Sequence, residues 1–215
     1  MGLRPADMAG VFLSFEGIDG SGKSTQSRLL ADTLRASGYD VVLTREPGGS
    51  AGAEDIRRLV LEGAADRWST ETELLLFTAA RRDHLEKTIR PALARGSVVI
   101  CDRFADSTRI YQGITRGDLR ATVDRLHDLM IGVDPDLTFL IDIDPSIGLS
   151  RAVARAGSEL RFEGMGLVLQ SRARDGFRAL ATRCADRFAV IDGGDDPVVV
   201  ARHVSTWAMG YLANR

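Results

Sequence analysis

The segment Gly17-Ile18-Asp19-Gly20-Ser21-Gly22-Lys23-Ser24 constrains the fold of this chain more than any other. It matches the pattern G-x-x-x-x-G-K-[ST], in which glycines let backbone N–H groups surround a phosphate, the lysine reaches the outer phosphates and the hydroxyl can bind Mg²⁺. Only two of the 28 lysines and arginines are lysines, and one is Lys23. Its compact ammonium suits a position between phosphate oxygens where the planar guanidinium of arginine would not fit. The segment therefore predicts a phosphate loop for a nucleoside triphosphate.

The residues on either side of the loop have the pattern that such a motif requires. Val11 to Glu16 is an apolar run typical of a buried strand, and Ser24 to Ser37 carries Leu29, Leu30 and Leu34 as a helix should. A helix that begins at the loop directs its free N–H groups and partial positive charge at an anion. This order of strand, loop and helix disfavours the alternative of a glycine-rich turn before an ordinary helix.

Five short apolar runs alternate with helical segments along the chain, a pattern typical of a parallel sheet with helices on both faces. We expect an α/β fold of the P-loop type with three layers, α/β/α, and ligands at the carboxyl ends of the strands. The longest expected helix covers about residues 70–90, and Pro91 should disrupt it near its end. The expected strands are Val11–Glu16, Val41–Arg45, Val98–Asp102, Leu137–Asp142 and Phe188–Asp192.

Length and composition favour one domain in a reducing compartment. The 215 residues are 44% hydrophobic, enough for a single P-loop domain over residues 11–215 after a loose leader at 1–10. Glycines and charges interrupt the periodicity at about 156–166, which predicts a short lid. The net charge of −2 and the pI near 6.0 disfavour nucleic acid or an anionic membrane as a partner. Two cysteines and no signal sequence indicate a cytoplasmic protein.

Arginines stand near the expected ligand edge of the sheet. Arg45 closes the second expected strand, Arg103 follows the third, and the long helix carries Arg81. A guanidinium in such a place can bind a phosphate through two N–H groups. We predict this role for Arg45 and Arg103, whereas the pattern alone leaves a surface position open for Arg81.

Three further strings follow the phosphate loop: Thr44-Arg45-Glu46-Pro47-Gly48-Gly49, Asp102-Arg103-Phe104, and Asp106-Ser107-Thr108-Arg109-Ile110-Tyr111-Gln112-Gly113. Together with Phe15-Glu16 before the loop, they resemble the thymidylate (dTMP) kinases of bacterial type, from Val11 to about Ile191. The resemblance implies ATP-dependent phosphorylation of dTMP to dTDP in dTTP synthesis, with Mg²⁺ as cofactor. It also implies a homodimer built through helices.

The same resemblance implies sites for ATP, the metal and the acceptor phosphate. ATP is expected at residues 17–25, of which Thr25 is the last, and Mg²⁺ at Ser24 and near Asp102. The acceptor phosphate is expected between Arg45, Arg81 and Arg103.

For the nucleoside, the resemblance implies that Phe77 stacks on thymine and that Thr108 and Gln112 lie near the edge of the base. It implies that Tyr111 packs beside the sugar and excludes a 2′-hydroxyl, and that Asp19 receives the 3′-hydroxyl. The residues alone leave simpler interpretations open: a helix core for Phe77, a buried aromatic for Tyr111 and a loop cap for Asp19.

Arginines stand both in the expected lid (Arg161) and on the expected helix after Pro145 that leads to it (Arg151 and Arg155). Because the phosphate loop has no arginine at positions 18–21, the chain resembles the family type that carries catalytic arginines in the lid, which implies this role for Arg151, Arg155 and Arg161. Arg151 and Arg155 stand four apart and share a helix face, so a solvated face stays open for Arg155. Leu160 and Met165 replace acidic residues that are frequent in family lids, which leaves the closing contacts open.

Two other functions stay open: a kinase for another nucleoside monophosphate, and a non-catalytic P-loop protein that binds nucleotides. A G protein is disfavoured because no N-K-x-D string occurs. The three histidines show no metal-ligand spacing. The Glu46–Pro47 bond is a candidate cis peptide.

Overall fold

Strand β1 lies at the centre of a five-stranded sheet in the computed structural model, which describes residues 10–64, 66–115, 117–154 and 166–214. The strand order is β2-β3-β1-β4-β5, and every pairing is parallel. The predicted sheet is confirmed, and its carboxyl ends meet at one edge, as parallel pairing requires. The strands are β1 Val11–Glu16, β2 Val41–Arg45, β3 Val98–Asp102, β4 Leu137–Asp142 and β5 Phe188–Asp192.

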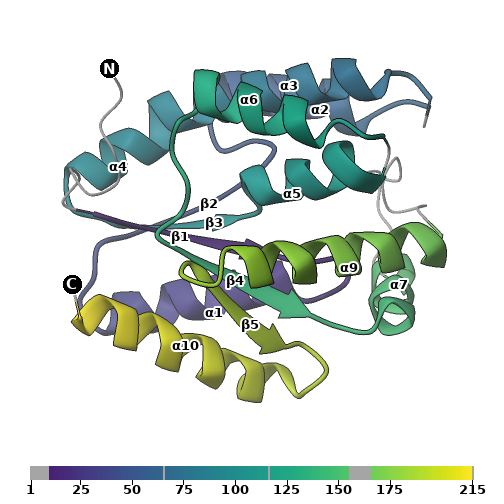
Figure 1. Ribbon diagram of the computed structural model, residues 1–215. Helices are drawn as coiled ribbons and strands as arrows, with labels where there is room; N and C mark the ends of the chain where they lie inside the picture. Colours follow the sequence, from purple (N-terminus) through teal and green to yellow (C-terminus); the bar gives the residue numbers. More distant parts are fainter. Residues whose placement is uncertain (1–9, 65, 116, 155–165, 215) are drawn as a thin grey trace.

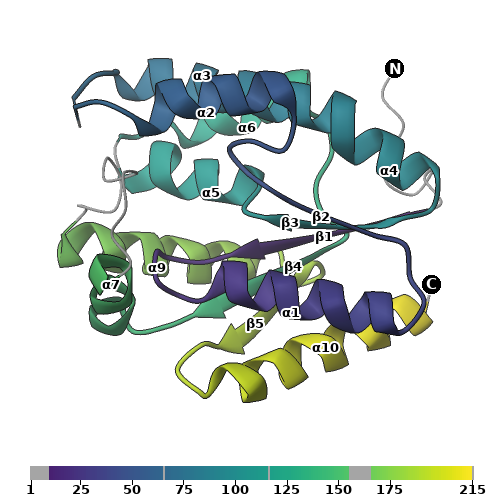
Figure 2. The same ribbon diagram turned by 180° about the vertical axis from the view of Figure 1, so that it is seen from behind.

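Helices cover both faces of this sheet (Figure 1), and the reverse view shows α1 and α10 side by side on one of them (Figure 2). On the other face lie α4, α5 and α9, with α2, α3 and α6 beyond α5. The predicted α/β/α layering is therefore confirmed. The helices are α1 Lys23–Ala36, α2 Ala51–Leu61, α3 Thr70–His84, α4 Arg90–Ala94, α5 Ala105–Ile110, α6 Arg120–Met130, α7 Pro145–Ala154, α9 Leu167–Arg183 and α10 Pro197–Ala213, with π-helical turns η2 Leu85–Ile89 and η3 Tyr111–Thr115.

Alternation along β1 divides the core between the two faces. Leu13 and Phe15 pack with α1 and α10, whereas Phe12 packs with α4 and α5 on the opposite side. The ring of Phe12 meets the ring of Phe104 edge to face at 4.9 Å. Successive side chains of a strand point to opposite faces, so each buried strand contributes to two cores.

The long helix continues past the place where we expected it to be disrupted. It begins after Ser69, whose side chain accepts from the N–H of Thr72, and α3 ends at His84. A π-helical turn follows, and α4 then includes Pro91 in its first turn and ends at Ala94. Because proline lacks an N–H and its ring crowds the preceding turn, the irregularity precedes Pro91 instead of ending the helix there.

Several expectations lie outside the described residues: the leader at 1–9, the lid apart from Gly166, and Arg155, Leu160, Arg161 and Met165. They stay predictions. None of the helices in the described part of the chain combines the length and apolar character needed to span a bilayer.

Candidate functional site

The phosphate loop connects β1 to α1 at the carboxyl edge of the sheet. Gly17, Gly20 and Gly22 have φ values of 139°, 76° and 98°, a region that side chains other than glycine rarely adopt. A Cβ on Gly20 would lie 1.9 Å from the carbonyl oxygen of Gly148, so α7 packs directly on the loop. Helix α1 starts at Lys23 and has no acidic residue in its first turn, which leaves its N-terminal partial positive charge available to an anion.

Lys23 is buried at the mouth of this loop. Its Nζ donates to the carbonyl of Ile18 at 2.6 Å and to Oγ of Ser21 at 3.3 Å. Burial and the nearby Arg103 lower the pKa of Lys23 to about 8, against the opposing effect of Asp19. The ammonium is thus held in place but poorly neutralised, as a group that binds phosphate should be.

Ser24 and Asp102 come together across the loop. The hydroxyl of Ser24 donates to Oδ2 of Asp102, and Oδ1 of Asp102 is buried with no hydrogen-bond partner among the described residues. No group of three or more His, Cys, Asp or Glu in that part of the chain could hold a metal. A hydroxyl and one carboxylate are nevertheless the kind of donor set that fits Mg²⁺, which commonly completes its shell with water and substrate phosphates.

Two adjoining cavities open at this edge. The first, here called the loop hollow, is lined by the phosphate loop, the ends of β2 and β3, and Ala152 of α7. The second, here called the inner cavity, lies between α2, α3, α5 and η3. Four residues line both cavities and so mark their boundary: Asp19, Glu46, Arg57 and Arg103.

Arg103 and Asp19 form an ion pair at this boundary. Nη2 of Arg103 donates to Oδ1 of Asp19, and the guanidinium lies 5.3 Å from the centre of the Tyr111 ring. Burial alone would raise the pKa of Asp19, but Arg103 and Lys23 outweigh it and lower the pKa. Asp19 therefore stays ionised, and its side-chain partners are Arg103 and, at 3.3 Å, Nε2 of Gln170.

The three predicted arginines do not share one cavity. Arg45 lines only the loop hollow, where its half-exposed side chain pairs with Glu54 at 3.2 Å. Arg81 lines only the inner cavity and is 4% exposed, which excludes the surface alternative. Arg103 lines both.

Arg81 belongs to a group of four side chains in the inner cavity, together with Phe77, Thr108 and Gln112. Its Nε donates to Glu46 at 2.7 Å and its Nη2 to Oγ1 of Thr108 at 3.0 Å. Phe77 precedes Arg81 by four residues and Gln112 follows Thr108 by four, so two helical faces oppose each other across the cavity. Phe77 is only partly buried, so the cavity position replaces the helix-core alternative.

Tyr111 lies beside this group on η3, next to Gln112. Tyr111 is both core and lining, because its ring meets Phe177 edge to face at 6.1 Å and also borders the inner cavity. Nε2 of Gln112 donates to buried Glu73 at 3.3 Å. Phe177 thus packs against Tyr111 and Glu73 binds Gln112, while both side chains line the inner cavity.

Sequence reasoning missed several residues of the site. Arg57 on α2 donates to the carbonyl of Pro47 at 2.6 Å and lines both cavities. The only available signal was its position on the helix after Gly48-Gly49, a position that neighbouring Arg58 shares. His84 is fully buried and contacts Thr44 and Glu46, which explains its place beside the site without a metal. The expected cis bond at Glu46–Pro47 is present.

Of the expected lid arginines, only Arg151 lies among the described residues. Its Nη1 donates to the carbonyl of Gly193 at 3.5 Å, and it lines neither cavity. Its expected catalytic role therefore stays a prediction, together with those of Arg155 and Arg161.

A parallel sheet with a phosphate loop beside one cavity and an arginine-bordered second cavity defines a P-loop phosphotransferase with room for two substrates. The family model described as thymidylate kinase matches residues 15–203. The chain belongs to the thymidylate kinase family, and this makes it a kinase that acts on nucleotides.

Relatives agree over nearly the full chain. The thymidylate kinase of Ruegeria pomeroyi is 69% identical, over 94% of this chain and 96% of its own length, and that of Dinoroseobacter shibae is 65% identical over 91% and 94%. The crystal structure of thymidylate kinase from Ehrlichia chaffeensis is similar with a TM-score of 0.75 at 39% identity, covering 93% of this chain and 98% of that one.

Proposed function

We propose that this chain transfers the γ-phosphoryl group of ATP to dTMP, forming dTDP and ADP in the synthesis of dTTP. The observation that carries the proposal is the Arg103–Asp19 pair at the boundary of the two cavities, next to Lys23. An acceptor phosphate bound at this boundary would face the outer phosphates of a triphosphate in the loop hollow. Such an end-to-end arrangement is what direct transfer requires.

ATP would bind at residues 17–25, with its phosphates among the backbone N–H groups of the loop and Nζ of Lys23. Ser24 and Asp102 would hold Mg²⁺, because both offer oxygen atoms at the loop and one oxygen of Asp102 is buried without a partner among the described residues. When bound, the ion neutralises charge on the phosphates.

The acceptor would occupy the inner cavity with its phosphate toward Arg103. Arg57 and Arg45 lie on the same side, so we add Arg57 to the predicted phosphate ligands. Arg81 lies with Phe77 and Thr108 in the group of four side chains in the inner cavity, and it does not line the loop hollow. We therefore assign Arg81 to the base instead of the phosphate. Its N–H groups can donate to a carbonyl oxygen of thymine.

The remaining polar and aromatic groups would hold the nucleoside. Phe77 offers a face for stacking on the base, and Thr108 and Gln112 offer polar atoms at its edge. Asp19 would accept from the 3′-hydroxyl of the sugar, and Tyr111 would leave no room for a 2′-hydroxyl. Both lie beside Arg103, between the base and the phosphate.

In the transfer, an oxygen of the dTMP phosphate attacks the γ-phosphorus, a new P–O bond forms, and the bond to the leaving ADP oxygen breaks. Lys23 and the arginines stabilise the negative charge on both sides of the moving group. We propose a single domain that follows a loose leader and carries a short lid at about residues 156–166. Arg161 in this lid, and Arg151 and Arg155 on the helix before it, would supply further positive charge to the phosphates. Arg151 would have to exchange its contact with Gly193 for the phosphates.

We further propose a cytoplasmic homodimer, with neither nucleic acid nor a membrane as partner. Large apolar side chains are exposed on adjacent helices: Leu75 on α3 by 59%, and Leu129 and Met130 on α6 by 73% and 48%. Such a surface is typical of a protein interface, and a second copy offers a matching one through two-fold symmetry.

An assay of ADP release with dTMP, dUMP, UMP, CMP and no acceptor tests the proposed reaction. We expect the highest kcat/KM with dTMP and little release without an acceptor. Preference for another monophosphate would identify a different kinase, and ATP binding without a diphosphate product would identify a non-catalytic protein.

A further inference from the structure

Glu16 ends β1 and is completely buried. It shares a strand face with Phe12 and Ser14, the face that α5 covers, because every second side chain of a strand points the same way. It lines neither cavity. A buried carboxylate in this position requires partners, and all those it has lie at the start of α5.

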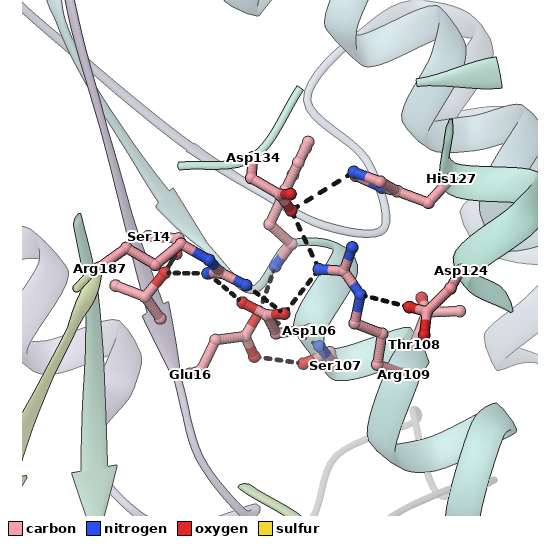
Figure 3. A network of polar contacts seen from close by, with 12 residues as sticks. Ser14, Glu16, Asp106, Ser107, Thr108, Arg109, Asp124, His127, Asp134 and Arg187 are labelled. Atoms are coloured by element: carbon pink, nitrogen blue, oxygen red, sulfur yellow. Dashed lines mark hydrogen bonds and ion pairs between the residues drawn. The ribbon is translucent and has the colours of Figure 1, made fainter. Parts of the chain in front are cut away.

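The carboxylate of Glu16 accepts three hydrogen bonds there. Oε1 accepts from the N–H groups of Phe104 at 2.8 Å and Ser107 at 3.2 Å, and Oε2 accepts from the hydroxyl of Ser107 at 2.6 Å (Figure 3). Phe104 is the N-cap residue of α5 and its side chain makes no capping hydrogen bond, whereas its own N–H donates to Glu16, 88 positions away. Glu16 thus accepts hydrogen bonds from both the N-cap residue and the first turn of α5.

Arg103 stands directly before this helix start. It is the only non-glycine residue in the described part of the chain with a positive φ, 70°, a conformation that requires support from its surroundings. Its N–H donates to the carbonyl of Phe15 at 2.9 Å, and its Nη1 donates to the hydroxyl of Ser107 at 2.9 Å. The hydroxyl that Glu16 orients is therefore the one that holds the guanidinium.

We infer that Glu16 is a positioning residue for phosphate binding: through Ser107 it holds the backbone turn and the guanidinium of Arg103 toward the acceptor phosphate. The inference rests on the proposed function, in which Arg103 binds that phosphate. It makes Glu16, the last residue of β1 before the phosphate loop, a further residue needed to bind the acceptor phosphate.

Substitution Glu16→Gln tests this with little change in size. The amide keeps one oxygen for the two N–H groups but presents NH₂ to the Ser107 hydroxyl, which then loses its acceptor. We expect the affinity for dTMP to fall about tenfold, while the affinities for thymidine and ATP stay within about twofold. Thymidine lacks only the phosphate, so the ratio of the two affinities isolates the effect on Arg103. Burial and nearby Asp106 raise the pKa of Glu16 to about 7, so the wild-type carboxylate is mostly ionised at pH 8. Calorimetry at pH 8 therefore compares a charged carboxylate with a neutral amide.

Controls separate positioning from a loss of structure. Ser107→Ala should lower the same ratio and replaces the first variant if that does not fold. Asp134→Asn, which changes a carboxylate that contacts Arg109 and His127, should leave the ratio unchanged (Figure 3). In an Arg103→Ala background, Glu16→Gln should lower dTMP affinity no further.

Equal losses for dTMP and thymidine, or additive losses in the Arg103→Ala background, would overturn the inference. An unchanged ratio in an enzyme that still forms dTDP would overturn the positioning role alone. A wild-type protein that forms no dTDP would instead overturn the proposed function.

Discussion

The hydroxyl of Ser24 donates a hydrogen bond to Oδ2 of Asp102, 78 positions away in the chain. Ser24 lies in the first turn of α1 and Asp102 ends β3. The parallel pairing of β1 with β3 places the end of β3 beside the loop that precedes α1. The two residues proposed as metal ligands therefore meet at the phosphate loop although they lie far apart in the sequence.

Asp102→Asn should lower the rate at a fixed subsaturating Mg²⁺ concentration by about 100-fold, equivalent to about 2.7 kcal/mol, because a neutral amide binds Mg²⁺ less tightly than a carboxylate. Steady-state rates across a magnesium titration measure the effect. Asp142→Asn is a control, since Asp142 ends β4 but pairs with Arg174 at 2.7 Å. Equal effects of the two substitutions would argue against a metal role for Asp102.

ATP affinity should fall as the pH rises above 8. Burial lowers the pKa of Lys23 to about 8, so above that pH the free protein must take up a proton before the ammonium can bind phosphate. The loss should approach tenfold per pH unit, measured by calorimetry between pH 7 and 9.5. The other lysine, Lys87, is exposed on η2. Its substitution Lys87→Ala should leave this profile unchanged. Lys23→Ala should abolish both the profile and phosphoryl transfer.

The same shift affects stability in the opposite direction. Because Lys23 loses its proton at a lower pH in the folded protein than in the unfolded chain, the unfolded chain binds more protons between about pH 8 and 10.5. The contribution of this group to the free energy of unfolding therefore rises with pH in that window. Urea titrations at pH 8 and pH 10 measure the change in the free energy of unfolding between these two pH values. An equal change in wild type and in Lys23→Met would contradict the assigned pKa.

Arg57→Ala should raise the KM for dTMP by about 10- to 100-fold, from the loss of one or two charge-assisted hydrogen bonds to its phosphate. Arg58→Ala is the matched control, because Arg58 is exposed and pairs with Asp55 on the same helix. Initial-rate measurements at fixed ATP distinguish the two arginines. Equal values of KM for both variants would remove Arg57 from the site.

Asp106→Asn should lower the free energy of unfolding by about 3–5 kcal/mol, because it leaves buried Arg109 and partly buried Arg187 without their shared carboxylate. Asp106 accepts from Arg109 at 2.7 Å and from Arg187 at 2.7 Å, and is 1% exposed (Figure 3). Urea unfolding measures the loss. Asp55→Asn, at an exposed pair, should change stability by less than about 1 kcal/mol.

Arg161→Ala should lower kcat more than it changes the KM for dTMP, because a lid arginine would contact the moving phosphoryl group mainly in the transition state. Single-turnover rates with both substrates saturating test this directly. A variant with normal kcat and raised KM would place Arg161 in ground-state binding instead.

Much of the fold could be predicted because its signals are local. Apolar runs bounded by charges gave all five strands, and the glycines of residues 17–22 predicted the loop from the backbone conformations that they allow. The helical period also extended correctly through α3, but it could not show how Pro91 would be accommodated.

The sequence by itself determined the strands, the phosphate loop and most side chains around it, since each depends on the chemistry of neighbouring residues. Only the tertiary structure decided that Arg57 and not Arg58 reaches the cavities, that Arg81 lies apart from Arg45, and that Glu16 supports Arg103. These depend on which faces of distant elements pack together. A local period records that a side chain is on one face of its element, but not which partner that face will meet.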